Sequence, residues 1–511
     1  MSLSFKKLNP TAAERKFGNI EWYQQASAGK PFTISYPCSA CLGLTLGGKK
    51  LPVRFELLFY YHQGYMEGYF SKRSLKSISN YYYGRQKRDQ GFINKFYKQW
   101  RSKYVNSLLK FIAQMGANNL KNYSLEQLLA RHSEFSLLYA KFWRECMFLD
   151  AFDLYGHELL QKTISGFNIN ITQDDLEILV TPPQASTLQQ ERLALLLIAE
   201  RLRKSQGGQP GTYSQAIKAQ PFLLKALARH SRNYHWLYNS YIAAETLMPK
   251  HFYRQIVKLL RRPQLLKQEQ ELRRDLKLLA VKQIKLRNKY GLTRRQSSLV
   301  EFFGMLGTLR DERKTYSQMA TAELDKLHQA IAGQAGWGRQ LVDHVFWWEA
   351  GTVFRNPAKF KKEISVRLQQ PLFWEFIGPQ GGGQLSGQSA VQQNKLMVES
   401  IQSQSKLQGM VAYPGVVRGR VRIIKTKEDF SKMKRGDILV APNTRPEYVP
   451  IMKIAGAIIS DEGGMTCHSA IVSRELRIPC IVGVQSATAL LKDGELIEVD
   501  AKNGVIKKLK K

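Results

Sequence analysis

The chain has 511 residues, 43% of them hydrophobic and 11% aromatic, and a formal net charge of +36. This composition is too apolar for an intrinsically disordered protein, and the length suits two to four domains of ordinary size. The sequence has no run of about 18 apolar residues and no apolar stretch behind its first charged residues. We therefore expect no membrane span and no secretory signal, and we interpret the protein as soluble and cytoplasmic.

The positive charge is spread over the chain instead of being gathered in one block. Residues 409–511 contain 18 Lys and Arg against 11 Asp and Glu, so most of the surplus lies in the first 408 residues. Such a charge favours acidic partners, whether nucleic acid, a membrane surface or phosphorylated small molecules. Because the basic residues recur along amphipathic segments, we interpret them as solvated helix faces and do not expect nucleic-acid binding.

The five cysteines are an odd number scattered through a long chain, which is typical of reduced thiols. Cys38 and Cys41 have CxxC spacing, but a structural zinc ion needs two further ligands. No second CxxC and no HxxxH follows them. We therefore expect no metal site.

Residues 1–51 form an N-terminal segment to which we assign no structure, and residues 52–363 are predicted to form one or two α-helical domains. One apolar stripe has members three or four residues apart, or at multiples of these spacings, as on the buried face of a helix. It consists of Phe92, Phe96, Trp100, Tyr104, Leu108 and Met115.

Two further helix starts have the spacing of a capping box, in which side chains satisfy the first backbone amides of a helix. Ser124 precedes Gln127 by three residues, and Thr187 precedes Gln190 by three. We predict N-caps at Ser124 and Thr187.

Several charged residues and histidines of this region are candidates for a site. Arg310 and Arg313 share one helix face, with Glu301 and Glu312 nearby in the sequence. We interpret these four as ion pairs that hold helices together, since such pairs are common. His157 and His344 are isolated histidines, for which packing is the better interpretation.

The last third of the chain changes character twice. Residues 364–408 combine apolar segments with a glycine run and then polar residues, which indicates a hairpin followed by a flexible linker. From 409 to 511, short apolar strings alternate with turns and are interrupted by two helices, at about 446–454 and 468–477, as in a compact α/β domain. The strings are GVVRGRVRIIK, GDILVAP, AGAIIS, IPCIVGV, GELIEVD and GVIKKLK.

The segment AGAIISDEGGMTCHSAIVSREL carries the chemistry. It predicts a buried strand, a sharp turn at Gly463 and Gly464, and a helix whose first turn holds His468. A helix N-terminus offers unpaired amides and a partial positive charge, which would stabilise a phosphoryl group on His468. The neutral imidazole of histidine is a nucleophile near pH 7.

The residues around His468 provide further candidates. Thr466 offers a hydroxyl two residues earlier, and Gly463, Gly464 and Ser469 are candidates for the turn or for phosphate contacts. Arg474 lies six residues into the helix, where it is able to approach the phosphate or brace Glu475.

The string GGMTCHSAIVSRELRIPCIVG, preceded by VAPNTRPEYVPIMKIAGAIISDE and GMVAYPGVVRGRVRIIK, resembles the swivelling phosphohistidine domain shared by phosphoenolpyruvate (PEP) synthase, pyruvate phosphate dikinase and rifampin phosphotransferase. The resemblance implies that His468, in the TxHxA core, is the phosphorylated histidine. It also places Thr466 where some members carry a regulatory phosphorylation. The segment around residues 90–350 more loosely resembles the helical part before this domain in rifampin phosphotransferase.

The resemblance yields a fold class and a function. We expect a multidomain α+β protein, with a mainly α-helical N-terminal region followed by a C-terminal swivelling α/β phosphohistidine domain over 409–511. The function expected is that of a phosphotransferase component, in the transferase and kinase class. Its His468 carries phosphate between a nucleotide or PEP site and an acceptor that the helical region holds.

Other parts of the family are missing from the sequence. We recognise no ATP-grasp pattern before residue 408, and we expect no C-terminal barrel of the kind found in the synthase and the dikinase. We therefore expect no cofactor motif in this chain, and a separate ATP-grasp protein that supplies ATP and Mg²⁺. The alternative is a non-catalytic regulatory or binding module that keeps the phosphohistidine fold and uses its basic helical region for acidic partners.

Overall fold

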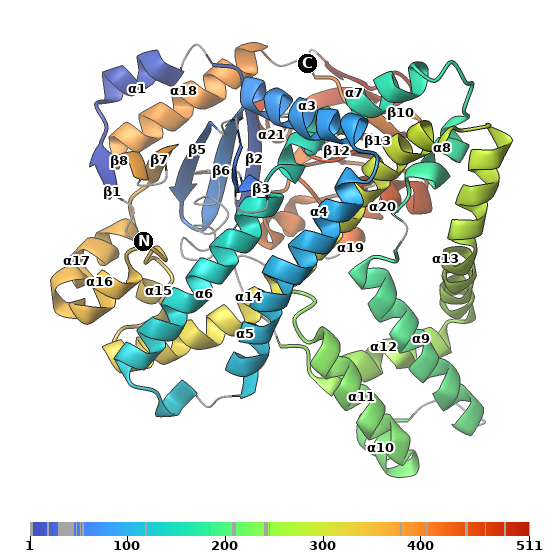
Figure 1. Ribbon diagram of the computed structural model, residues 1–511, viewed down its shortest axis with the longest axis horizontal. Helices are drawn as coiled ribbons and strands as arrows, with labels where there is room; N and C mark the ends of the chain where they lie inside the picture. Colours follow the sequence, from blue (N-terminus) through green and yellow to red (C-terminus); the bar gives the residue numbers. More distant parts are fainter. Residues whose placement is uncertain are drawn as a thin grey trace. The chain divides into compact units, whose positions relative to one another are not determined.

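The computed structural model describes residues 4–17, 20–28, 45–46, 49–51, 53, 56–117, 120–182, 184–206, 211–239, 244, 246–378, 381–404, 407–444, 448–464, 467–484 and 487–509. The fold is mainly helical with two mixed sheets (Figure 1), in agreement with the expected α+β class. No helix in these ranges is both long and apolar enough to span a membrane. The chain divides into two compact units, one of Met1–Tyr81, Asp150–His157 and Trp337–Lys511, the other of Tyr82–Leu149 and Glu158–Gly336.

The second unit is helical. Its longest helix, α14 (Arg294–Ala335), packs against α4 (Phe92–Trp100), α5 (Asn106–Ala117) and α6 (Leu125–Cys146). The predicted apolar stripe is buried along its whole length. A π-helical turn, η1 (Arg101–Val105), interrupts it between α4 and α5.

A second core in this unit lies among four helices and buries Leu195, Leu227 and Phe252. These helices are α9 (Thr187–Gln206), α10 (Tyr213–Ala219), α11 (Pro221–Tyr234) and α12 (Pro249–Arg261). Helices α8 (Gln173–Val180) and α13 (Pro263–Lys289) also belong to this unit. Helices α3 (Lys72–Arg88) and α7 (Leu149–Ser165) belong to it in part.

The two predicted helix caps have different outcomes. Ser124 is the N-cap of α6, and its capping box with Gln127 is present as predicted. The cap predicted at Thr187 is wrong by one residue, because Ser186 and Gln189 exchange the two capping hydrogen bonds. Thr187 is the first residue of α9, and its amide and hydroxyl donate to Asp311 on α14.

In the first unit, a six-stranded sheet has the order β1-β8-β7-β5-β6-β2. The strands are β1 (Ser4–Lys7), β2 (Trp22–Ala28), β5 (Leu57–His62), β6 (Tyr65–Ser71), β7 (Leu372–Gly378) and β8 (Gly381–Ser386). Only β1 and β8 pair in parallel. Residues from the two ends of a segment of more than 350 residues therefore build one sheet.

This sheet confirms one expectation and changes two. Residues 57–71 were expected to be helical but form two strands. The segments LLFYYH and YMEGYFS, both rich in aromatic residues, pair with each other on either side of a turn at Gln63 and Gly64. The hairpin expected after residue 364 is present as β7 and β8, and it joins β5 of the same sheet. The boundaries expected at 52 and 364 therefore cut through one sheet.

The flexible linker expected before 408 is for the most part a helix. This helix, α18 (Gln388–Gln404), packs with α1 (Pro10–Phe17) on one face of the sheet. Ala390, Met397 and Ile401 are buried there, so the polar residues of the segment are the outer face of an amphipathic helix.

The seven-stranded sheet is built from residues 410–508 alone, in the order β15-β14-β10-β11-β12-β13-β9. Its strands are β9 (Met410–Tyr413), β10 (Val416–Ile423), β11 (Ile438–Ala441), β12 (Ala457–Ser460), β13 (Cys480–Val482), β14 (Leu496–Asp500) and β15 (Val505–Lys508). Strands β10 to β13 run parallel. All six predicted apolar strings contribute a strand.

Both faces of the central strands are buried, which is why the strings read as continuous apolar runs. Leu439 and Ile458 face a core that includes residues of α19 (Val449–Met452) and α20 (His468–Leu476). Val440 and Ile459, the next residue of each strand, face the opposite core with α21 (Ala487–Leu490). The two predicted helices of this domain are thus α19 and α20.

Candidate phosphohistidine site

The site lies at the carboxyl ends of the parallel strands β11 and β12, where loops of neighbouring strands meet. Strand β12 ends at Ser460, and α20 begins at His468. Gly463 makes the turn between them with φ +111°, a conformation that favours glycine. A Cβ atom there would lie 2.7 Å from Sγ of Cys467. Gly464 has no such constraint, since nothing lies within 4 Å of a Cβ added to it.

The imidazole of His468 is held by Thr444, three residues beyond β11. Oγ1 of Thr444 lies 2.7 Å from Nδ1 of His468 and 2.9 Å from Oγ of Ser469. Thr444 and Ser469 are both buried. Thr444 was not predicted from the sequence, although its position just after the strand string GDILVA could have indicated it.

The start of α20 is suited to hold negative charge. The N-cap residue Cys467 makes no side-chain capping hydrogen bond, although the backbone amides of Ser469 and Ala470 approach its sulfur. Burial raises the pKa of the Cys467 thiol, which keeps it uncharged at neutral pH. A phosphoryl group on His468 would therefore meet the positive end of the helix without competition from a thiolate.

Two carboxylates fix the loop between β12 and the glycine turn. Asp461 is buried and accepts hydrogen bonds from the amide of Thr488, at 3.0 Å, and from its hydroxyl. Burial raises the pKa of Asp461 to about 6, although both bonds from Thr488 act in the opposite direction. Glu462 accepts a hydrogen bond of 3.3 Å from Asn443 Nδ2, which ties this loop to the one that carries Thr444.

Three other residues near His468 were candidates for the site: Arg474, Ser469 and Thr466. Nε of Arg474 donates to the carbonyl oxygen of Ala412 on β9, at 3.2 Å. This bond braces the helix against the sheet edge, a third possibility beside the two expected from the sequence. Ser469 contacts Thr444, and Thr466 lies outside the described residues.

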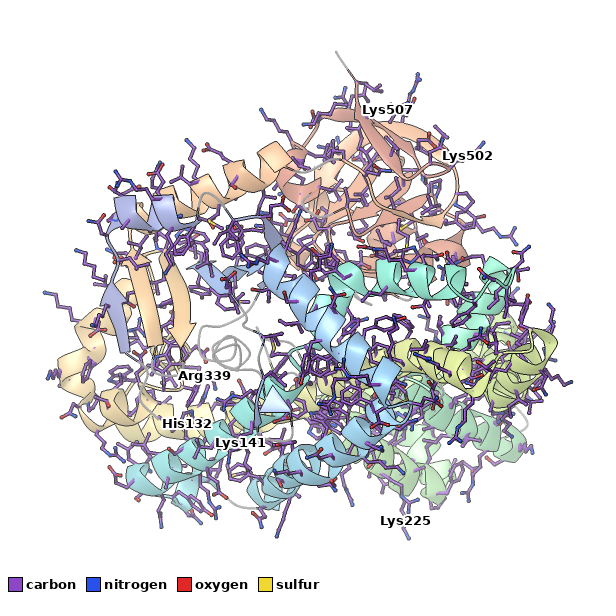
Figure 2. The ribbon with its side chains drawn as sticks, turned by 45° about the horizontal axis from the view of Figure 1, so that its top comes forward. His132, Lys141, Lys225, Arg339, Lys502 and Lys507 are labelled. Atoms are coloured by element: carbon purple, nitrogen blue, oxygen red, sulfur yellow. The ribbon has the colours of Figure 1, made fainter. Side chains whose placement is uncertain are left out.

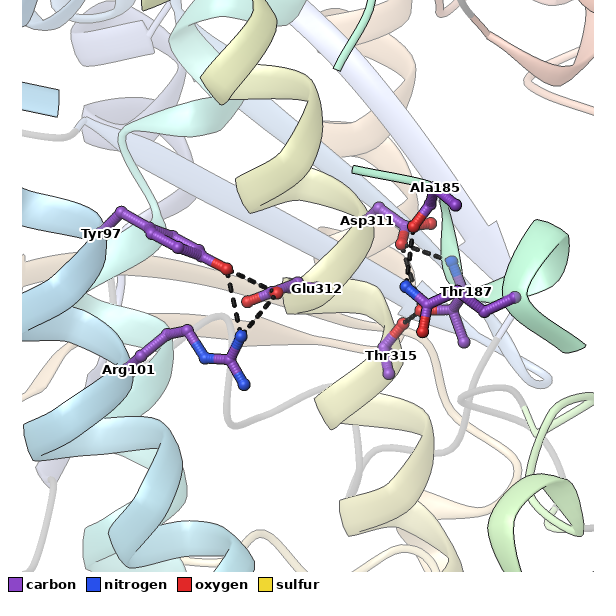
Figure 3. A network of polar contacts seen from close by, with 8 residues as sticks. Tyr97, Arg101, Ala185, Thr187, Asp311, Glu312 and Thr315 are labelled. Carbon is purple, nitrogen blue, oxygen red and sulfur yellow. Dashed lines mark hydrogen bonds and ion pairs between the residues drawn. The ribbon is translucent and has the colours of Figure 1, made fainter. Parts of the chain in front are cut away.

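Of the four charged residues of α14 interpreted as ion pairs, Glu312 forms one, Glu301 and Arg313 bond to neutral groups, and the role of Arg310 stays a prediction. Figure 3 shows Tyr97 and Arg101 reaching Glu312, whose Oε1 lies 2.8 Å from the tyrosine hydroxyl and 3.2 Å from the guanidinium. Burial raises the pKa of Glu312. Glu301 accepts a bond from Asn94, and Arg313 donates to the carbonyl oxygen of Cys146.

Of the two isolated histidines, His344 is half-buried and contacts its neighbours, whereas His157 is exposed, so a packing role for His157 stays a prediction. Nε2 of His344 lies 3.4 Å from the hydroxyl of Tyr61, and its Nδ1 lies 2.9 Å from the carbonyl oxygen of Gln340. Partial burial lowers the pKa of His157.

Solvated lysines account for part of the basic charge. In Figure 2, Lys225, Lys502 and Lys507 point away from the ribbon, as expected for exposed side chains. Among the described residues, no group of three or more His, Cys, Asp or Glu could hold a metal ion. Cys38 and Cys41 lie outside the described residues.

Comparison with known proteins places this site in a family domain. Residues 433–504 match the family described as "PEP-utilising enzyme, mobile domain". The probable phosphoenolpyruvate synthase of Archaeoglobus fulgidus is 48% identical over 108 residues, which are 21% of this chain and 14% of that protein. The phosphoenolpyruvate synthases of Aeropyrum pernix and Pyrococcus furiosus are 52% and 51% identical over 101 and 102 residues, in each case 20% of this chain and 12% of the relative.

The match is thus confined to the C-terminal domain, and the chain spans no more than 14% of the length of these relatives. Among solved structures, holo aconitase X of Thermococcus kodakaraensis aligns with 20% of this chain and 98% of its own, at 21% identity and a TM-score of 0.17. That score supports no statement about fold or function.

Proposed function

We propose, from the premise that the C-terminal region carries a PEP-utilising enzyme mobile domain, that His468 accepts a phosphoryl group and delivers it to an acceptor. The observation that carries this proposal is the position of His468, at the start of α20 with Nδ1 beside Thr444. A helix start favours the dianion that forms, and the threonine fixes the ring.

The hydrogen bonds of His468 support Nε2 as the nucleophile. When Nδ1 carries the proton of the neutral ring, it donates to Oγ1 of Thr444, and the threonine hydroxyl donates onward to Oγ of Ser469. Nε2 then bears the lone pair that attacks phosphorus. The bond from phosphorus to the donor oxygen breaks as the Nε2–P bond forms. The proton on Nδ1 stays in place, so the ring leaves as neutral imidazole when the acceptor takes the phosphoryl group.

The donor, the acceptor and the partner belong to the proposal as well. PEP is the first candidate donor, because the matching family is named for its use. A separate ATP-grasp protein is the second, and it would bring ATP and Mg²⁺ to His468. The acceptor would bind to the helical region, which is the largest part of the chain without another assigned role.

The test is incorporation of labelled phosphate. The purified chain is incubated with ³²P-labelled PEP, and with γ- or β-labelled ATP together with candidate ATP-grasp proteins. We expect label that is stable in base and labile in acid, and its loss in His468→Ala. His235→Ala, which changes a half-buried histidine of the helical unit, is the matched control and should label like the wild type.

The competing function is a non-catalytic regulatory module. It predicts that the wild type and His468→Ala remain equally unlabelled with every donor and partner. That result would remove the carrier function and leave the domain as a binding module.

A further inference from the structure

The hairpin of β5 and β6 ends in a tight turn that presents Tyr65. Gln63 and Gly64 both have positive φ, 47° and 83°, as in the two-residue turns that match the twist of a hairpin. The Gly64 amide donates to the hydroxyl of Tyr61 at 3.0 Å, which fixes the turn. Tyr65 is therefore held at the end of a rigid element of the six-stranded sheet.

A lysine of the seven-stranded sheet contacts this tyrosine. Nζ of Lys425, two residues beyond the end of β10, lies 5.1 Å from the centre of the Tyr65 ring, a cation–π distance. The carbonyl oxygen of Lys425 accepts a bond from the hydroxyl of Tyr448, at 3.3 Å, and the Tyr448 ring packs in the core beside α20. The lysine backbone is thus tied to the element that follows the Thr444 loop.

The carboxylates that precede the glycine turn lie on the same side. Burial raises the pKa of Tyr65, and Glu67, Asp461 and Glu462 raise it further. Burial and Glu462 likewise raise the pKa of Tyr23 on β2, the strand beside β6. The Tyr65 hydroxyl is buried and has no hydrogen-bond partner among the described residues. The uncharged Tyr65 hydroxyl and Lys425 therefore lie near the loop that contains Asp461 and Glu462 and leads to His468.

We propose that the end of the β5–β6 hairpin is a docking surface for the mobile domain of the same chain. The cation–π contact between Tyr65 and Lys425 stabilises the docked domain. Helix α18 also lies against α21, but the short connection from residue 404 to 410 brings those two together in any case. No such tether acts between Tyr65 and Lys425. Their contact joins the sheet to the end of the domain that bears His468.

This inference goes beyond the proposed function, because docking does not require that His468 be phosphorylated. The test therefore uses the full, unphosphorylated chain and measures amide hydrogen exchange by mass spectrometry in two segments, 57–71 and 448–464. Lys425→Ala should raise exchange in both segments about two- to fivefold, the size expected for one partly exposed cation–π contact. Tyr65→Leu should have the same effect, and the double variant should add nothing further.

Conservative variants separate docking from general destabilisation. Tyr65→Phe keeps the ring and Lys425→Arg keeps the charge, so both should behave like the wild type. Lys427→Ala, another exposed lysine of the same loop, is the matched control and should change nothing. If Tyr65→Leu disturbs folding, Lys425→Ala still decides, because Lys425 is exposed.

The proposal is overturned if Lys425→Ala leaves exchange in 57–71 unchanged, or if the two single effects are simply additive. A chain that passes this test and yet takes no label from any donor would keep the docking surface and lose the carrier function. The two proposals therefore fail separately.

Discussion

The two large sheets of this protein differ in how their strands are distributed along the chain and in the direction of their pairing. The seven-stranded sheet uses one continuous stretch of about a hundred residues and places four strands in parallel. The six-stranded sheet collects strands from residues 4–71 and 372–386 and is almost wholly antiparallel. Parallel strands bring the loops at their carboxyl ends to one edge, whereas antiparallel neighbours place successive loops at opposite edges. The candidate chemistry accordingly gathers at one end of the seven-stranded sheet.

The largest effect on stability is expected from Asp461, in the loop between β12 and the glycine turn. Its pKa is raised because burial disfavours the charged carboxylate. Since its pKa is about 6 in the folded domain and 3.8 ordinarily, the unfolded chain loses the proton first as pH rises. Stability should therefore fall between about pH 4 and pH 6, by about 3 kcal/mol, and stay constant above that range.

Asp461→Asn should abolish this fall and stabilise the domain at pH 7.5. Hydrogen exchange of the Ile458 and Ile459 amides in β12, measured at pH 4.5 and 7.5, gives the opening free energy of both proteins. A wild type and variant that differ equally at the two pH values would contradict the prediction.

Gly463 should have the next largest effect. Gly463→Ala places a Cβ at φ +111° and within 2.7 Å of the Cys467 sulfur, and should destabilise the domain by about 2 kcal/mol. Gly464→Ala, the adjacent control, meets no atom within 4 Å and should stay within about 0.5 kcal/mol of the wild type. The same β12 amides report the result, and equal losses in both variants would contradict the assigned turn.

Thr444 tests the chemistry at this sheet edge. Thr444→Val removes the hydroxyl beside Nδ1 of His468 and should slow incorporation of labelled phosphate about tenfold, because the ring loses its orienting hydrogen bond. Thr444→Ser keeps the hydroxyl and should remain close to the wild type. Unchanged labelling in Thr444→Val would show that the threonine does not select the tautomer.

The smallest effect is expected on the helical side of the comparison. Arg101→Met breaks the ion pair with Glu312, but the arginine side chain is 41% exposed, so the loss should stay below about 1 kcal/mol. Exchange of α14 amides measures that loss, and labelling of His468 should be unchanged. A large loss of labelling would show that the cluster of Tyr97, Arg101 and Glu312 takes part in phosphoryl transfer and does not only stabilise the helices.

The same contrast decides what could be predicted from the sequence. In the seven-stranded sheet, Val440 and Ile459 lie in apolar strings whose partners are close in the chain, so local pattern and tertiary pairing agree. The hairpin at 57–71 was missed although β5 and β6 pair with each other across a two-residue turn. Only the pairing of β5 with Phe373 and its neighbours, some 300 residues away, lies beyond the local pattern. Helix α18 was missed because Met397 and Ile401 are few among polar residues, although their spacing of four was visible.

The candidate site was predicted in part. His468 and Gly463 were found because they lie in one continuous motif, and their local geometry agrees with that prediction. Thr444 was not found, since its role appears only when β11 and β12 are paired. The roles assigned to Arg474, Ser469 and Thr466 remain predictions.

The divided sheet also sets an order of events during synthesis. Strands β5 and β6 leave the ribosome roughly 300 residues before β7 and β8, a wait of about 15 to 60 s at ordinary rates of translation. Through that interval one long side of β5 has no neighbour, and its aromatic face lacks the cover that α18 later supplies. The helices made in between have time to form their own core first, so the nascent chain needs a means of shielding the hairpin until its partners arrive.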